Sequence, residues 1–185
     1  MPTAYIGIGS NIEPEKNIQK ALILLSEKVL ISGISTFYLT KPFDRTDQQL
    51  FYNGAARIET EDEPLALKYC ILRNIEKKLG RKRTGDTSSP RTIDLDILVY
   101  DRIVIHDEKL HIPDPDILER PFLALPLYEL SRNMILPGWN RAISAIAEQL
   151  KDSDMTPLTE YTEKLRRILK HEYKESRESG QRTAD

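Results

Sequence analysis

The order of alternating and helical segments is the feature that most constrains the fold of this chain. A two-residue apolar period or a β-branched and aromatic composition, typical of strands, occurs in 4–9, 31–39, 51–59 and 92–100. Apolar residues at helical spacing follow the first of these segments, after Pro14, and the third, up to Gly80. The order strand–helix–strand–strand–helix–strand predicts an α+β, ferredoxin-like core with its helices on one side of a largely antiparallel sheet.

The remaining segments are expected to add an extra strand and helices to this core. A β-type segment is predicted over 103–112, and helices are predicted near 122–130 and 141–150. We expect residues 1–150 to form one domain and residues 151–185 to form a charged C-terminal extension. In this extension Leu158, Tyr161 and Leu165 can line one more amphipathic helix, and from about Lys174 the chain is polar and expected to fray.

Charge is distributed unevenly along the chain. The formal net charge of −2 argues against a protein that coats nucleic acid, yet seven basic side chains stand against two acidic ones between Arg73 and Arg91. No stretch approaches the length of a membrane span, and the N-terminal residues show no secretory signal. We therefore expect a cytoplasmic protein that acts on small molecules, without a nucleic-acid or membrane partner. We also expect a monomer, although neither charge nor hydropathy determines the oligomeric state.

Two aspartates interrupt the apolar pattern of the 92–100 strand. Alternation places Asp94 and Asp96 on one face with Thr92, and places on the other face the apolar residues Ile93, Leu95, Ile97 and Val99. Neighbouring carboxylates repel each other, and a divalent cation such as Mg²⁺, which prefers oxygen ligands, would remove that conflict. A solvated polar face on a half-exposed strand is the competing interpretation of so short a motif.

Three arginines favour the metal interpretation. Arg81, Arg83 and Arg91 border the polar loop 81–90 that enters the same strand. A guanidinium group can bind two phosphate oxygens at once, and phosphoryl transfer depends on such cationic stabilisation. The pattern predicts a transferase that binds Mg²⁺ and a nucleotide triphosphate, without the glycine-rich phosphate loop, which is absent from the sequence.

An aromatic residue and an amide form a second candidate group. Phe51 and Asn53 share one face of the 51–59 strand, and such a pair suits a flat heterocycle with a polar edge. Phe122, just after Arg120-Pro121, could supply a second stacking face. Core packing is the alternative explanation for both rings.

Several segments together resemble the 6-hydroxymethyl-7,8-dihydropterin pyrophosphokinase family over residues 4–150. They are Ala4–Asn11, Phe51–Ala55, Pro90–Ile97, Ile112-Pro113 and Arg120–Leu127. The resemblance implies transfer of the β,γ-pyrophosphate of ATP to the hydroxymethyl oxygen of the dihydropterin, with release of AMP, in folate biosynthesis. The chain departs from the family at Thr87, at Ser88-Ser89, where many relatives have Trp-Gly, and at Asp114, where a histidine often stands.

The resemblance also implies a role for each site residue. Asp94 and Asp96 would hold two Mg²⁺ ions, and the catalytic arginines would be Arg81, Arg83 and Arg91. The pterin would contact Thr40, Phe43, Phe51, Asn53 and Phe122. Beside the three arginines, the nucleotide would contact Glu76, Ile97, Lys109, His111 and Arg120. An RNA-binding module on a ferredoxin-like sheet, and a metal-dependent phosphoryl transferase with another acceptor, are the alternatives.

Overall fold

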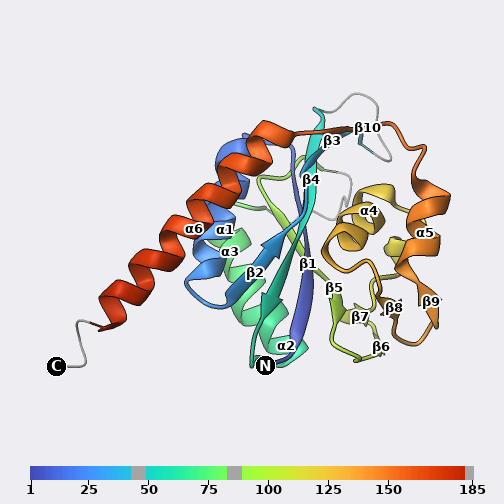
Figure 1. Cartoon of the computed structure of the whole chain (residues 1–185), viewed down its shortest axis with the longest axis horizontal. Helices are drawn as coiled ribbons and strands as arrows, with labels where there is room; N and C mark the ends of the chain where they lie inside the picture. The colour runs from blue at the N-terminus through green and yellow to red at the C-terminus, as the bar shows by residue number, and fades with distance from the viewer. Residues whose placement is uncertain (43–48, 83–88, 182–185) are drawn as a thin grey trace.

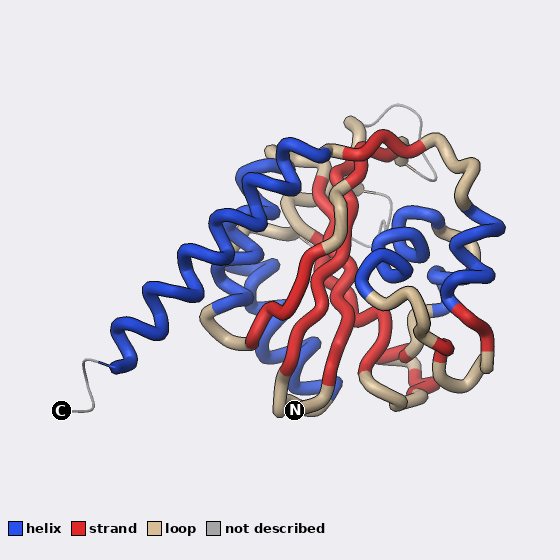
Figure 2. Tube along the Cα trace, in the orientation of Figure 1, coloured by secondary structure: helices blue, strands red, loops and turns tan. Residues whose placement is uncertain are grey.

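The computed structural model describes residues 1–42, 49–82 and 89–181, with side chains up to Tyr173. A six-stranded sheet has the order β10-β3-β4-β1-β5, with β2 also paired to β4, and its neighbouring strands are antiparallel. Figure 2 shows this sheet at the centre of the molecule. The strands are β1 (Thr3–Ser10), β2 (Leu30–Ile34), β3 (Tyr38–Thr40), β4 (Phe51–Glu59), β5 (Asp94–Tyr100) and β10 (Met155–Pro157). The predicted α+β, ferredoxin-like fold is confirmed.

Helices cover both faces of the sheet (Figure 1). On one face lie α1 (Pro14–Ser26), the helical run Pro64–Lys78, and α6 (Thr159–Gln181), which enclose a first core that includes Ile6, Leu22, Ile58 and Leu72. The run Pro64–Lys78 consists of α2 (Pro64–Ala66), a π-helical segment (Leu67–Leu72) and α3 (Arg73–Lys78). On the other face α4 (Pro121–Leu130) and α5 (Ile143–Leu150) enclose a second core that includes Leu98, Ala124, Leu127 and Ile146.

Smaller elements connect these layers. Two hairpins flank the 3₁₀ turn Pro115–Leu118 and helix α4, one before the turn and one after the helix. The hairpins are β6 (Ile105–Asp107) with β7 (Leu110–Ile112), and β8 (Ile135–Leu136) with β9 (Arg141–Ala142). The predicted β-type segment 103–112 is therefore a hairpin outside the main sheet.

The segment 31–39 forms two strands rather than the single strand predicted. Between β2 and β3, the hydroxyl of Ser35 accepts a hydrogen bond from the N–H of Ala55 at 2.9 Å. The N–H of Ser35 donates to the carbonyl of Ala55, also at 2.9 Å. A side chain thus replaces a backbone carbonyl in the ladder, which interrupts the strand at this point.

Strand β5 contains a bulge at Leu98. In the pairing with β1, Ile6 faces Ile97 and Tyr5 faces Val99, so Leu98 is an extra residue. Leu98 and Val99 therefore both belong to the second core, whereas Ile97 belongs to the first. The prediction that Val99 shares a face with Ile93, Leu95 and Ile97 is wrong, because strict alternation stops at the bulge.

The C-terminal segment packs on the sheet. Strand β10 pairs with β3, and α6 lies along α1, with Tyr161 and Leu165 in the first core. The predicted amphipathic helix is present, and its backbone stays helical to Gln181, past Lys174, where fraying was expected. Half of the residues from Lys174 to Gln181 are Glu, Lys or Arg, which are good helix formers and favour this continuation. None of the described helices combines the length and apolarity needed to cross a bilayer.

Candidate active site

The end of helix α3 sets the position of Arg81. Gly80 adopts a left-handed conformation with φ of 78°, which glycine accepts at little cost. Its N–H donates to the carbonyl of Lys77 at 3.1 Å, and the N–H of Arg81 donates to the carbonyl of Glu76 at 3.0 Å. This pair of bonds is the Schellman motif that ends many helices. It turns the chain so that the guanidinium of Arg81 meets the carboxylate of Glu76.

Glu76 also joins this helix end to the start of β5. Its Oε1 accepts a hydrogen bond from the N–H of Leu95 at 2.9 Å. Only 3% of its side chain is exposed, so its carboxylate offers almost no surface to a ligand. The resemblance implies a nucleotide contact for Glu76, and the structure places it as an anchor for Arg81 beneath the site.

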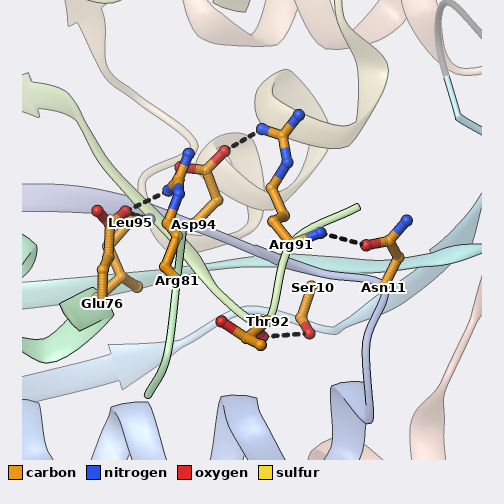
Figure 3. Close-up of polar contacts among 8 residues, drawn as sticks. All are labelled: Ser10, Asn11, Glu76, Arg81, Arg91, Thr92, Asp94 and Leu95. Atoms are coloured by element: carbon orange, nitrogen blue, oxygen red, sulfur yellow. Dashed lines mark hydrogen bonds and ion pairs between the residues drawn. The ribbon is translucent and has the colours of Figure 1, made fainter. Parts of the chain in front are cut away.

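The turn after β1 holds the residues that lead into β5 (Figure 3). The hydroxyl of Ser10 donates to the carbonyl of Thr92 at 2.6 Å, and Oδ1 of Asn11 accepts from the N–H of Arg91 at 2.8 Å. These two contacts were not predicted from the sequence. The available signal was the pair of polar side chains where β1 ends, because buried side chains of this kind usually bond to backbone groups.

Arg81 and Arg91 converge on Asp94 (Figure 3). Nη1 of Arg81 bonds to Oδ1 of the aspartate, and Nη1 of Arg91 bonds to Oδ2. Only 16% of the Asp94 side chain is exposed. Burial by itself would raise the pKa of Asp94, but the two guanidinium groups outweigh burial and lower it. Asp94 is therefore an ionised carboxylate with both oxygens bound to cations.

Asp96 lies on the same face, two residues along the strand, with a different environment. Its half-buried carboxylate makes no hydrogen bond or ion pair with any of residues 1–42, 49–82 or 89–173. Burial, and then the charge of Asp94, raise the pKa of Asp96 to about 7, although the charge of Lys68 acts in the opposite direction. One member of the pair thus has two cationic partners and the other has none among these residues.

This donor set fits a divalent cation. Within the described part of the chain, no three His, Cys, Asp or Glu side chains are grouped as metal ligands. Mg²⁺ commonly takes one or two carboxylates and completes its shell with water and substrate phosphates. Asp94 and Asp96 would supply those carboxylates, and the ion would stabilise the charged form of Asp96, which its surroundings disfavour.

Asn53 lies in line with Asp94 across three strands. Asn53 of β4 pairs with Gly9 of β1, and Gly9 pairs with Asp94 of β5. The side-chain nitrogen Nδ2 of Asn53 donates to Oγ1 of Thr40 at 2.7 Å. A Cβ atom on Gly9 would lie 2.7 Å from Oδ1 of Asn53, so glycine is what leaves room for this amide. The structure therefore brings Thr40 and Asn53 together, as the resemblance implies, in one row with Asp94.

The two predicted stacking rings each lie near an arginine. The guanidinium of Arg91 is 5.6 Å from the ring centroid of Phe51, and that of Arg120 is 5.9 Å from the centroid of Phe122. Arg120 also pairs with Asp116 at 3.1 Å. The rings of Phe51 and Phe122 are not in contact with each other in the described structure. A ligand stacked between them requires this separation.

The other predicted nucleotide residues lie on β5 and on the β6–β7 hairpin. Ile97 is 2% exposed and its side chain belongs to the first core, so only its backbone can face a ligand. Lys109 and His111 are exposed on the β6–β7 hairpin. The carbonyl of Lys109 accepts from Nζ of Lys68 at 3.3 Å, and the ring of His111 lies 6.0 Å from that of His106. Phe43 and Arg83 fall outside the described residues, as do Thr87 and Ser88.

Comparison with known proteins gives one consistent answer. The family model for 7,8-dihydro-6-hydroxymethylpterin-pyrophosphokinase matches residues 5–132. The chain is 38% identical over 161 residues to the 2-amino-4-hydroxy-6-hydroxymethyldihydropteridine pyrophosphokinase of Haemophilus influenzae, covering 85% of this chain and 99% of that protein. The enzyme of the same name from Bacillus subtilis is 38% identical over 134 residues, which cover 71% of this chain and 79% of that protein.

Some relatives are much longer than this chain. The folic acid synthesis protein of Pneumocystis carinii is 37% identical over 169 residues, which cover 89% of this chain but 22% of that protein. A solved structure of Plasmodium falciparum HPPK-DHPS has a TM-score of 0.66 at 15% identity, covering 82% of this chain and 44% of the solved one. That likeness supports the fold alone.

The matched region contains the Asp94–Asp96 strand, the arginines described above and the Asn53 row, and it leaves out the segment after residue 132. The RNA-binding alternative has no support among these relatives. The chain belongs to the 7,8-dihydro-6-hydroxymethylpterin-pyrophosphokinase family.

Proposed function

We propose that this chain transfers the β,γ-pyrophosphate of ATP to the hydroxymethyl oxygen of 6-hydroxymethyl-7,8-dihydropterin, giving AMP and the pterin diphosphate. The observation that carries the proposal is the row of Asn53, Gly9 and Asp94 across three adjacent strands. The row puts an amide suited to a heterocycle edge on one side of a bare glycine and a metal-binding type of carboxylate on the other. Family membership supports this assignment of the two sides.

At the carboxylate end, Asp94 and Asp96 would hold two Mg²⁺ ions. When bound, these ions neutralise phosphate charge and lower the pKa of a coordinated alcohol. Arg81 and Arg91 now occupy both oxygens of Asp94. With Mg²⁺ bound at the two aspartates, the guanidinium groups of Arg81 and Arg91 would be available to phosphate oxygens of ATP. Glu76 keeps Arg81 at the site during that exchange, and we include Arg83 in this cluster from the family pattern.

At the amide end, Thr40 fixes the orientation of Asn53. Its hydroxyl takes one donor of the amide, which leaves the remaining polar atoms to the edge of the pterin. Phe51 and Phe122, with Phe43, would supply the stacking surfaces. Ile97, Lys109, His111 and Arg120 would contact the nucleotide, Ile97 through its backbone because its side chain is in the core.

In the reaction, the hydroxymethyl oxygen attacks the β-phosphorus and the bond to the α-phosphate oxygen breaks, so AMP leaves. The hydroxyl proton passes to solvent, and we assign no side chain as base. The protein contributes alignment and positive charge, which are the main requirements of phosphoryl transfer. One chain carries both ends of the row, so we propose a monomer acting on small molecules in the cytoplasm.

The test is incubation with ATP, Mg²⁺ and the hydroxymethyl-dihydropterin, followed by separation of the nucleotides. We expect AMP and pterin diphosphate in equal amounts, and no reaction when the metal is removed with EDTA. Formation of ADP would identify an ordinary kinase, and an unchanged pterin would contradict the proposed acceptor.

A further inference from the structure

The backbone of Phe37 is held by the C-terminal segment, more than a hundred residues away in sequence. The N–H of Phe37 donates to Oγ1 of Thr162 at 2.9 Å, and its carbonyl accepts from the N–H of Leu158 at 2.7 Å. The hydroxyl of Thr162 in turn donates to the carbonyl of Leu158 at 2.9 Å. Thr162 is 1% exposed, so its bond to the N–H of Phe37 is shielded from water.

The same segment packs against the back of β4. The ring of Tyr161 meets Phe37 and Tyr52 edge-on, with centroids 6.0 and 5.5 Å apart. Phe37 is fully buried against Gly54, where an added Cβ would lie 2.8 Å from the ring. Tyr52 and Gly54 are the neighbours of Asn53 in β4, and alternation turns them to the face opposite its side chain. The Tyr161 and Phe37 rings therefore support the strand directly behind Asn53.

Strand β10 supports the partner of Asn53 as well. Strand β3 has three residues, and it lies between β4 and β10, with Thr40 opposite Met155 on one side and Phe51 on the other. Without β10, β3 would be an edge strand paired with β4 alone. Thr40 is the residue whose hydroxyl binds the amide of Asn53. Its position therefore depends on the segment 155–165.

We propose that residues 155–165 position the pterin-binding amide, through Thr162, Tyr161 and strand β10. This inference rests on the proposed function for its substrate, and it gives a role to a segment that follows residues 5–132, the part matched by the family model. None of these residues touches the reacting groups. They keep β3 against β4 so that the amide of Asn53 is oriented before the pterin arrives.

The kinetic test compares Thr162→Val with a matched control. Valine keeps the shape of threonine but leaves the N–H of Phe37 without its acceptor, so we expect the pterin KM to rise about tenfold. The ATP KM should stay within about twofold, because Arg81, Arg91 and Asp94 are held by other contacts. Thr162→Ser, which retains the hydroxyl, should restore the pterin KM. Thr3→Val, at a threonine at the start of β1 whose hydroxyl forms no hydrogen bond with the described residues, is the control and should change neither KM.

The second measurement needs no substrate. We expect the backbone amides of β3 and Asn53 in Thr162→Val to exchange with solvent about tenfold faster than in wild type and in Thr3→Val. If Thr162→Val does not fold, Tyr161→Leu carries the same expectations, since it removes the ring behind β4. Equal rises in both KM values, or an unchanged pterin KM, would overturn the inference when wild type is active. If the wild type shows no turnover, the proposed function is refuted instead. In that case the positioning role is still tested by hydrogen exchange, and an unchanged exchange rate of the β3 amides in Thr162→Val would contradict it.

Discussion

The two ends of the Asn53–Gly9–Asp94 row are stabilised in different ways. At the Asp94 end, charged groups between residues 76 and 94 hold one another, and the chain brings them together over a short distance in sequence. At the Asn53 end, neutral hydrogen bonds and aromatic rings come from residues as far apart as 37 and 162. We expect the first end to control the rate of the proposed reaction and the second to control pterin affinity.

The largest effect should follow from Asp96→Asn. The substitution keeps the volume and removes the charge that would bind Mg²⁺, so we expect kcat to fall about 10³-fold or more. Stability without metal should not decrease, because the repulsion between Asp96 and Asp94 disappears. The measurement is steady-state kinetics with thermal unfolding. Asp101→Asn, at an exposed position that tolerates asparagine, is the control, and a kcat equal in both variants would refute the metal assignment.

A smaller effect, on the pterin KM rather than on kcat, should follow from Gly9→Ala. The added methyl group would meet Oδ1 of Asn53 at 2.7 Å and displace the amide, so we expect the pterin KM to rise about tenfold with a small change in kcat. Gly33→Ala is the matched control, because its nearest neighbour would be Leu130 at 3.5 Å, an ordinary contact. If Gly9→Ala instead lowers kcat alone, the two ends are not separate in the way described.

The smallest effect should follow from Tyr38→Phe. The hydroxyl of Tyr38 donates to Glu129 of α4, and its loss should cost about 1 kcal/mol of stability in urea unfolding. Glu129 would still accept from the N–H of Thr36 at 2.7 Å, so we expect β3 to stay in place and the pterin KM to be unchanged. Tyr5→Phe, at a tyrosine whose hydroxyl forms no hydrogen bond with the described residues, is the control. A raised pterin KM in Tyr38→Phe would show that α4 also positions the amide.

The sequence predicted the charged end better than the neutral end. Asp94, Asp96, Arg81 and Arg91 carry a signal in their residue types and lie close together along the chain, and the structure brings Arg81, Arg91 and Asp94 into contact. The sequence could not reveal that Thr162 binds the backbone of Phe37, because an isolated threonine in a helix carries no sign of a partner 125 positions away. The sequence also could not locate the Leu98 bulge. Leu98 and Val99 are both apolar, so either residue can face either side of a sheet that is covered on both faces.

That bulge also determines how the faces of β5 are divided. In a regular strand, the positions after Asp96 on the same face would be residues 98 and 100; the extra residue instead turns both Leu98 and Val99 toward the second core and returns Tyr100 to the first. The alternation of side chains that holds from Asp94 to Ile97 therefore does not continue past the bulge. The face that carries the two carboxylates is followed by two consecutive apolar side chains packed in the second core, where strict alternation would allow only one of them.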